Sequence, residues 1–521
     1  MNAGVLALGA GLLAITAAAV VAVRRIPVTV DEAWFLQVIV RQSRGEVLYR
    51  DVFYGAGPLP VWIGGLAVRG RRRPMLVLRV VGILYFMGLL LAGSWVLASA
   101  HAPAPAFAVL WIGSLAFVPP TSTVDSHYTR VALLTAVLAT GIVMHIGSSG
   151  AEVAFVLAGA AAGLSFSAKQ TIGIAATVAL GASAIVVGGF QAAVWYVLGA
   201  VVAAGVCLVP LARVQALGWY VRRSFRNKTV YLAVGRVGFR DGLREALRRT
   251  FSSRAQQAVY GSVAVAAYLV FPAVLVACAI ALRNVVVDDP SGSARLSDMA
   301  TLALGAVVCS AAVPRLDFTH VRGLFPVALL TVALAVGAHP ASMHFVPDGA
   351  RLTATAGLLL VTALAAAISA RRVQLSQWSN GPVDHTTPYF EGLPVLHGTT
   401  PSGPADGAAL RERTGGRVFL LRPDASFWYL ASGLENPTPY DYPFASVFGP
   451  RGQQEVIEGI RAGRIAWVCS PGPTDGRQRP AQLEEFVARS MVAVEQTSAG
   501  VLYRLAADPT AGSSGPDARR S

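Results

Sequence analysis

The sequence predicts a polytopic α-helical membrane protein with a C-terminal soluble α/β domain. Three observations favour this fold class. Of the 521 residues, 54% are hydrophobic and only 14% are charged; the mean hydropathy is +0.55; and apolar residues gather into runs of bilayer length. A soluble domain carries about 25% charged and 45–50% apolar residues. The composition therefore excludes a soluble enzyme, a disordered chain and a collagen-like repeat.

Apolar runs of the length of a membrane span recur through residues 1–370, which we expect to form the membrane domain. A spanning helix needs about 20 mostly apolar residues. The first run is too long for the apolar region of a signal peptide and lacks preceding positive residues, so we interpret it as an uncleaved span. We expect about 11 spans, at 3–23, 75–99, 104–118, 128–146, 152–167, 170–187, 191–211, 257–281, 299–313, 323–339 and 352–370.

Two long loops interrupt the spans, at 24–74 and at 212–256. In the first loop, residues 31–42 predict an amphipathic helix that lies on the membrane surface. The second loop holds 11 basic residues. Within it, residues 240–252 predict a surface helix, for which an ordinary solvated face is the simpler explanation.

Residues 371–521 have the pattern of a soluble α/β domain with a disordered end. Strands are expected at 417–423, 464–470 and 492–504, alternating with helices at 426–433, 452–463 and 481–491, which favours a partly parallel sheet. Basic and acidic residues balance in this part, so the net charge of +15 falls in residues 1–370. That excess indicates anionic lipid or a phosphorylated ligand rather than nucleic acid, with topology-setting charge as the alternative.

Polar residues concentrate on one membrane face. With eleven spans, that face receives both long loops, Lys169 and the whole C-terminal domain, whereas the opposite face receives short connectors. Polar groups near lipid are costly and tend to mark a site. We therefore expect a single catalytic cavity on this face, although long loops also carry polar residues for no such reason.

An acidic pair, Asp31 and Glu32, follows the first run closely. A carboxylate placed there can take a proton from an acceptor hydroxyl. Acidic residues also favour the N-terminus of a surface helix for purely structural reasons. No CxxC or Cys/His cluster indicates a zinc site.

The segment around this pair resembles the first exoplasmic loop of the GT-C glycosyltransferases, which include protein O-mannosyltransferase-like enzymes and bacterial transferases that use polyprenyl-phosphate sugars. The matching elements of VDEAWFLQVIVRQSRGEVLYRDVFYGAGPLP are Asp31-Glu32, Trp34, Gly45, Tyr49-Arg50-Asp51 and Pro58-Leu59-Pro60. Further stretches resemble the family in the same order: VDSHYTR with Asp125 and His127, GLSFSAKQTIG with Lys169, PRLDFTH with Arg315, Asp317 and His320, and residues 421–442.

The resemblance implies a specific reaction. A sugar such as mannose or arabinose would pass, with inversion, from polyprenyl phosphate to a hydroxyl of an envelope glycan, lipid or protein. Asp31 would be the general base, and Glu32 would orient it or the acceptor. Lys169 and Arg315 would bind the donor phosphate. Asp51, Asp125 and His127 would lie near the acceptor or a divalent metal ion, with Tyr49, Asp317 and His320 in supporting roles.

Several of these residues have simpler explanations from the sequence. Lys169 is one of only two lysines among 43 basic residues, yet a lysine at an interface also snorkels. His127 fits an ordinary interfacial residue, and Asp317 fits a partner of Arg315 or a helix cap.

Orientation and function each have a competing interpretation. The resemblance places the first loop and the C-terminal domain outside the cell membrane, whereas the positive-inside rule places these basic loops in the cytoplasm. A transporter or flippase of lipid-linked sugars would need charged or broken helices near the midplane, of which we find few. A non-catalytic assembly protein would tolerate loss of Asp31.

Overall fold

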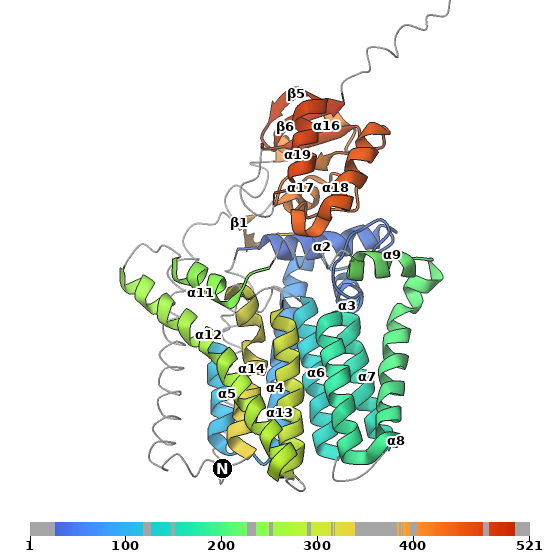
Figure 1. The fold of residues 1–521 in the computed structure, drawn as a ribbon. Coiled ribbons are helices and arrows are strands. Elements are labelled where there is room, and N and C mark those ends of the chain that lie inside the picture. The colour runs from blue at the N-terminus through green and yellow to red at the C-terminus, as the bar shows by residue number, and fades with distance from the viewer. Residues whose placement is uncertain are drawn as a thin grey trace, which may run out of the picture.

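The computed structural model describes residues 27–117, 127–146, 152–226, 236–248, 254–288, 293–313, 316, 318–338, 383–384, 387, 389–395, 404–472 and 479–505. A bundle of apolar helices carries a smaller α/β unit on one of its ends (Figure 1). The chain therefore has the predicted fold class of a multi-pass membrane protein with a C-terminal α/β unit. The expected spans at 3–23 and 352–370 lie outside the described residues.

Each expected span between residues 75 and 339 coincides with a helix. Within the described ranges, five helices are long and apolar enough to cross a membrane, judged by length and composition. Gly189 adopts φ 71° and ψ −171° and divides α8 into the two expected runs. The bundle helices are α4 (Pro74–Ser99), α5 (Ala104–Phe117), α6 (His127–Ile146), α7 (Glu152–Ala168), α8 (Gln170–Arg213), α12 (Arg254–Arg283), α13 (Ser293–Ala312) and α14 (Phe318–Ala338).

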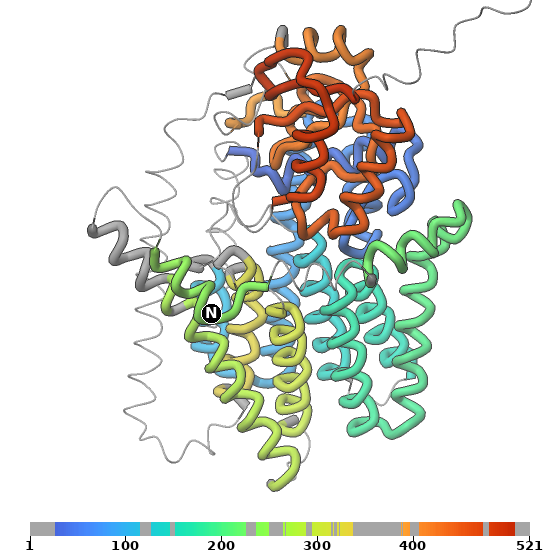
Figure 2. Tube along the Cα trace, turned by 45° about the horizontal axis from the view of Figure 1, so that its top comes forward, coloured from blue at the N-terminus to red at the C-terminus, as the bar shows by residue number. Residues whose placement is uncertain are grey.

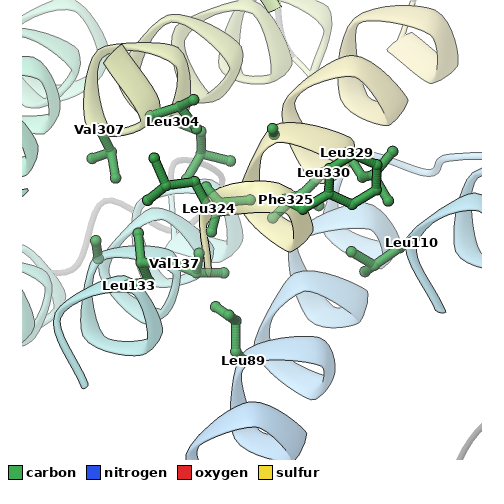
Figure 3. Close-up of a cluster of buried hydrophobic side chains, with 14 of the residues drawn as sticks. Leu89, Leu110, Leu133, Val137, Leu304, Val307, Leu324, Phe325, Leu329 and Leu330 are labelled. Atoms are coloured by element: carbon green, nitrogen blue, oxygen red, sulfur yellow. The ribbon is translucent and has the colours of Figure 1, made fainter. Parts of the chain in front are cut away.

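The centre of the bundle is an apolar cluster. Figure 3 shows Leu324, Phe325 and Leu330 of α14 surrounded by side chains from α4, α5, α6 and α13. Leu330 is 1% exposed and Leu324 is 2% exposed. Between lipid-embedded helices, close van der Waals contact replaces the hydrophobic effect as the attraction.

Small residues let α7 and α8 approach each other closely. A Cβ atom at Gly159 would lie 1.8 Å from the carbonyl oxygen of Tyr196, and one at Gly163 would lie 2.3 Å from that of Ala200. Glycines four residues apart on one helix face allow this backbone contact. The close packing of α7 on α8 therefore depends on glycine at these two positions.

A layer of short helices covers the end of the bundle that faces the α/β unit. Helix α2 lies across that end beneath the unit, and α3, α9 and α11 lie near the same end of the bundle (Figures 1 and 2). The expected surface helices at 31–42 and 240–252 correspond to α2 and α11. The layer comprises α2 (Val30–Ser43), α3 (Leu59–Val68), α9 (Leu217–Val221), the π-helix η2 (Arg222–Arg226) and α11 (Phe239–Arg248), and a second π-helix, η3 (Asn284–Asp288), follows α12.

The C-terminal unit contains a four-stranded sheet of order β3-β4-β6-β5. Strands β3 and β4 are parallel and the other pairs are antiparallel, as the sequence predicted for a partly parallel sheet. The elements are β1 (Val383–Asp384), β2 (Leu393–Pro394), α16 (Pro404–Thr414), β3 (Phe419–Leu420), α17 (Ala425–Ser432), α18 (Ala445–Arg461), β4 (Trp467–Ser470), α19 (Ala481–Ser490), β5 (Met491–Thr497) and β6 (Gly500–Leu505).

The prediction of a single strand at 492–504 was wrong. The chain turns at Ser498 and Ala499 and forms the hairpin β5–β6, with the Thr497 hydroxyl donating to the Gly500 carbonyl at 2.7 Å. Gly500 has φ +129°, and a Cβ there would lie 2.4 Å from the Ser470 backbone. The turn therefore needs glycine at this position.

Candidate active site

The acidic pair begins α2 inside a capping box. The Thr29 hydroxyl accepts a hydrogen bond from the Glu32 amide at 3.2 Å, and Glu32 accepts one from the Thr29 amide at 2.8 Å. Such reciprocal bonds satisfy two otherwise unpaired amides at a helix start. Asp31 is exposed and Glu32 is buried. The two neighbouring carboxylates therefore occupy different environments.

Glu32 forms a buried ion pair with Arg79 of α4. Arg79 donates from Nε to Glu32 Oε1 at 2.8 Å and from Nη2 to Oε2 at 2.9 Å. Their side chains are 0% and 2% exposed. Removing one partner of such a pair leaves a buried charge and costs about 3–5 kcal/mol. Glu32 thus fixes α2 against the bundle, and its predicted role in orienting Asp31 stays a prediction.

Lys169 occupies the break between α7 and α8. Its backbone is extended, with φ −147° and ψ 107°. Its Nζ donates to the Thr129 hydroxyl at 3.2 Å and lies 5.5 Å from the centroid of the Tyr128 ring. Lys169 as a whole is half-buried, at the end of the bundle that faces the layer.

The first loop is bound directly to this helix break. The Gly57 amide donates to the Ala168 carbonyl at 3.0 Å. A Cβ at Gly57 would lie 2.0 Å from the Ser167 carbonyl oxygen, so only glycine allows this approach. The loop that follows the acidic pair is therefore held beside Lys169, 112 positions later in the printed sequence.

A chain of aromatic rings connects the acidic helix to the lysine. The Trp34 and Tyr54 centroids are 5.6 Å apart, and those of Tyr54 and Tyr128 are 6.4 Å apart. Trp34 also stacks on Tyr442 of the C-terminal unit at 5.5 Å and 24°. Trp34 Nε1 and the Tyr54 hydroxyl are buried without a hydrogen-bond partner in the part of the chain that the structure describes.

His127 lies in an aromatic environment. Its ring stacks on Phe35 at 4.8 Å and meets Tyr85 edge-on at 6.1 Å. Among the described residues, no group of three or more His, Cys, Asp or Glu side chains is placed to hold a metal ion. The described contacts of His127 are therefore aromatic, and its predicted place near the acceptor or a divalent metal ion stays a prediction.

Tyr49 and Asp51 organise the first loop. Tyr49 has φ 69°, is fully buried and donates to the Ala56 carbonyl at 2.7 Å. Asp51 accepts from the Val47 amide at 2.9 Å and pairs with Arg50. Partial burial raises the pKa of Asp51, but hydrogen bonds from Arg50 and Val47 outweigh this and lower it below its usual range. Both residues shape the loop.

The remaining predicted site residues are only partly described. His320 is half-buried in the first turn of α14. Four residues earlier, the Leu316 amide donates to the Val237 carbonyl at 3.0 Å, which places this end of α14 near the start of α11. Asp125, Arg315 and Asp317 lie outside the described residues.

Arg41, which the sequence analysis missed, joins α2 to the C-terminal unit. Its Nη1 donates to both oxygens of Asp441 at 3.0 Å and to the Thr438 carbonyl at 2.9 Å, and its Nε donates to Glu46. Burial lowers the pKa of Arg41, but attraction to Asp441 and Glu46 more than compensates and raises it. The guanidinium therefore stays charged inside this interface.

A backbone bond and a shared core complete the interface. The Phe53 amide donates to the Pro439 carbonyl at 2.7 Å, and the Phe53 ring packs in the core of the C-terminal unit. Phe427 and Leu430 of α17 pack in turn among the buried residues of α2. The acidic helix is therefore enclosed between the bundle and the C-terminal unit.

Comparison with known proteins shows similarity in structure and not in sequence. No protein-family model matches the chain, and no curated protein matches it. The structure of ArnT from Cupriavidus metallidurans bound to undecaprenyl phosphate superposes with a TM-score of 0.53 at 14% identity, over 96% of this chain and 97% of ArnT.

Two further solved structures are similar at lower scores. The arabinofuranosyltransferase AftD from Mycobacteria matches with a TM-score of 0.46 at 13% identity, over 96% of this chain and 40% of AftD. The arabinosyltransferase EmbB from Mycobacterium smegmatis matches with a TM-score of 0.36 at 15% identity, over 70% of this chain and 41% of EmbB. The likeness to ArnT shows that the chain shares the fold of ArnT over nearly its whole length.

Proposed function

We propose that the chain is a membrane glycosyltransferase that moves a sugar from a polyprenyl-phosphate donor to a hydroxyl acceptor. One observation carries the proposal. The exposed carboxylate of Asp31 lies in the first turn of α2, and the loop that follows α2 is hydrogen-bonded, from the Gly57 amide to the Ala168 carbonyl, beside Lys169. The proposed base and the proposed phosphate-binding cation thus lie at the same end of the bundle. The similar fold of ArnT, which was solved with undecaprenyl phosphate bound, supports a lipid-phosphate donor.

Lys169 is the proposed partner of the donor phosphate. A compact ammonium stabilises the negative charge that develops on a leaving phosphate. Its position at the layer end of the bundle suits a lipid whose chain lies in the membrane and whose phosphate lies at the surface. Arg315 is a second proposed phosphate ligand from its sequence motif.

Asp31 is the proposed general base. The acceptor oxygen attacks the anomeric carbon, the bond from that carbon to the phosphate oxygen breaks, and the polyprenyl phosphate leaves with the bonding electrons. The acceptor proton passes to Asp31, directly or through one water. A single displacement inverts the anomeric centre. Glu32 cannot share this role while both of its oxygens are held by Arg79.

We place the reaction in residues 1–370, on the outer face of the cell membrane, with the C-terminal domain of residues 371–521 on the same side. The common end of the bundle on which α2 and the C-terminal unit lie supports a shared side, and the resemblance of the first loop to an exoplasmic loop supports the outer face. The test is labelling of intact cells with a membrane-impermeant maleimide after Arg44→Cys or Arg451→Cys, both at exposed positions. Labelling of both residues is expected, and labelling of neither would place this face in the cytoplasm.

The function is tested by supplying purified protein with radiolabelled polyprenyl-phosphate mannose or polyprenyl-phosphate arabinose. Wild type is expected to release polyprenyl phosphate, and Asp31→Asn is expected to lose about 10²–10⁴-fold of the rate, the usual worth of a general base. The matched control is Asp241→Asn, since Asp241 is an exposed acid in the first turn of the surface helix α11. Equal rates for wild type and Asp31→Asn would remove Asp31 as the base.

A further inference from the structure

We infer that α11 is a membrane-binding helix whose arginines bind anionic phospholipid headgroups in the leaflet at the layer end of the bundle. From the sequence alone, an ordinary solvated face was the simpler explanation of this helix. In the structure, the small, apolar, basic and acidic residues of α11 lie on separate sides of the helix. Attachment to lipid is independent of the proposed reaction, so either can fail while the other stands.

One side of α11 is fixed to the bundle. Gly242 and Ala246, four residues apart, are buried. A Cβ at Gly242 would lie 2.1 Å from the carbonyl oxygen of Leu316, two residues before α14 begins, so only glycine allows this contact. The Tyr268 hydroxyl of α12 donates to the same carbonyl. Helix α11 is therefore held where α14 begins, at the layer end of the bundle (Figure 1).

The other three sides follow from the periodicity of α11. With about 100° per residue, side chains four positions apart form a stripe along a helix. The arginine stripe lies about 180° from the buried stripe of small residues, and the apolar stripe lies about 180° from the acidic one. The arginine stripe is Arg240, Arg244 and Arg248, the apolar stripe is Phe239, Leu243 and Leu247, and the acidic stripe is Asp241 and Glu245.

This arrangement fits a helix that lies in a membrane surface at the edge of a bundle. The bundle side and the arginine stripe then point in opposite directions along the membrane plane, so the arginines face the surrounding headgroups. The apolar and acidic stripes point in opposite directions along the membrane normal, one to the acyl chains and the other to water. Interfacial helices of this kind combine a buried apolar face with electrostatic attraction to anionic lipids.

The exposed apolar side chains distinguish α11 from a helix that is surrounded by water. Phe239 is 38% exposed and Leu247 is 41% exposed. Phe239 also meets Tyr268 edge-on at 5.2 Å, which brings the apolar stripe beside α12. Apolar surface is unfavourable in water in proportion to its area, whereas acyl chains accept it. Lipid therefore explains an exposure that a solvated face does not.

The arginine stripe determines which lipid is bound. Its three arginines are exposed. Arg244 pairs with Asp241 at 3.4 Å, an exposed contact that contributes little to stability. A guanidinium offers two parallel N–H donors to the oxygens of a phosphate. Each arginine near an anionic membrane surface strengthens binding about fivefold, so we expect phosphatidylglycerol to be preferred to zwitterionic phosphatidylcholine.

The test measures hydrogen exchange of the backbone amides of residues 236–248 in the full-length protein, reconstituted in lipid nanodiscs. One nanodisc contains phosphatidylcholine alone, and the other contains an equal mixture of phosphatidylcholine and phosphatidylglycerol. Bound lipid slows exchange because opening of the helix must break the contacts with it. We expect phosphatidylglycerol to slow exchange in wild type about 25-fold or more, fivefold for each of the two arginines outside the Asp241 pair.

The decisive variant combines Arg240→Gln with Arg248→Gln. It removes two charges from the arginine stripe and leaves the pair of Arg244 and Asp241 in place. We expect phosphatidylglycerol to slow its exchange by less than about fivefold, the worth of the arginine that remains. Raising NaCl from 0.15 M to about 1 M shortens the screening length from about 8 Å to about 3 Å and should reduce the slowing in wild type.

A matched control and a second variant complete the series. Arg451→Gln combined with Arg464→Gln removes two exposed arginines from the C-terminal unit, so it should retain the wild-type slowing. Leu247→Gln removes one side chain of the apolar stripe. We expect exchange to become about three- to sevenfold faster in both kinds of nanodisc, because contact with acyl chains does not depend on headgroup charge.

Three results would overturn the inference. Wild type could exchange equally fast in the two kinds of nanodisc, or the variant without Arg240 and Arg248 could keep the full slowing. Soluble polyglutamate could also slow exchange in phosphatidylcholine nanodiscs as much as phosphatidylglycerol does, and the partner of α11 would then be an acidic protein segment. Release of polyprenyl phosphate is measured separately, so failure of lipid binding and failure of the proposed function are distinguishable.

Discussion

The helix bundle and the layer that covers it are built by different interactions. In the bundle, α4, α6 and α14 meet through leucine, valine and alanine side chains, and closely packed α7 and α8 meet through glycines. In the layer, α2 is held by two buried ion pairs: its Glu32 pairs with Arg79 of the bundle, and its Arg41 pairs with Asp441 of the C-terminal unit. The apolar contacts are non-directional and many, whereas the charged contacts are few and fix the helix in one orientation.

The difference explains how two adjacent acids acquire separate tasks. Glu32 points to the bundle and forms an ion pair with Arg79, so it fixes the position of α2. Asp31, one residue earlier, is turned about 100° around the helix axis and stays exposed. A layer held by directional bonds keeps the exposed carboxylate of Asp31 at a constant place, which an apolar contact alone does not achieve.

The largest expected effect comes from breaking the ion pair beneath α2. Arg79→Met leaves Glu32 charged and buried without its partner, and we expect a loss of about 3–5 kcal/mol in the free energy of unfolding. Unfolding of the purified protein in mixed detergent micelles measures this loss. We also expect the release of polyprenyl phosphate to fall, because α2 carries Asp31.

A double variant separates charge from shape in this pair. Arg79→Met combined with Glu32→Leu removes both charges and keeps apolar bulk, and replacement of a buried pair by apolar residues is often neutral or stabilising. We expect the double variant to regain most of the stability lost in Arg79→Met. If the two variants are equally unstable, the contact contributes through packing and not through charge compensation.

The positions of the helices could be predicted from the sequence because hydropathy is a local property. Each apolar run between 75 and 339 became a helix, and even the break at Lys169 and the division at Gly189 were visible as interruptions. The capping residues Thr29 and Glu32 are likewise three apart and predict the start of α2. Arg79 was overlooked, although an arginine within an apolar run indicates a buried partner.

The contacts of the layer could not be predicted in this way because they join distant parts of the chain. Arg41 meets Asp441 across 400 residues, and Trp34 meets Tyr442 across a similar span. No periodicity within one segment indicates such pairs. Among the predicted site residues, the structure brings the loop of Asp31 to Lys169 and buries Tyr49 within that loop.

A smaller effect is expected from the bundle side of the comparison, at Gly159. Gly159→Ala places a methyl group 1.8 Å from the Tyr196 carbonyl oxygen, so α7 and α8 must separate. We expect a loss of about 1–3 kcal/mol in the free energy of unfolding, measured in the same micelles.

Gly205→Ala is the matched control, because Gly205 lies in the partner helix α8 with nothing within 4 Å of the added Cβ. Alanine there favours the helix, so its stability should stay equal or rise slightly. Equal losses in both variants would mean that backbone approach does not fix the α7–α8 pair, and the contrast between an apolar bundle and a directional layer would lose its best-defined apolar example.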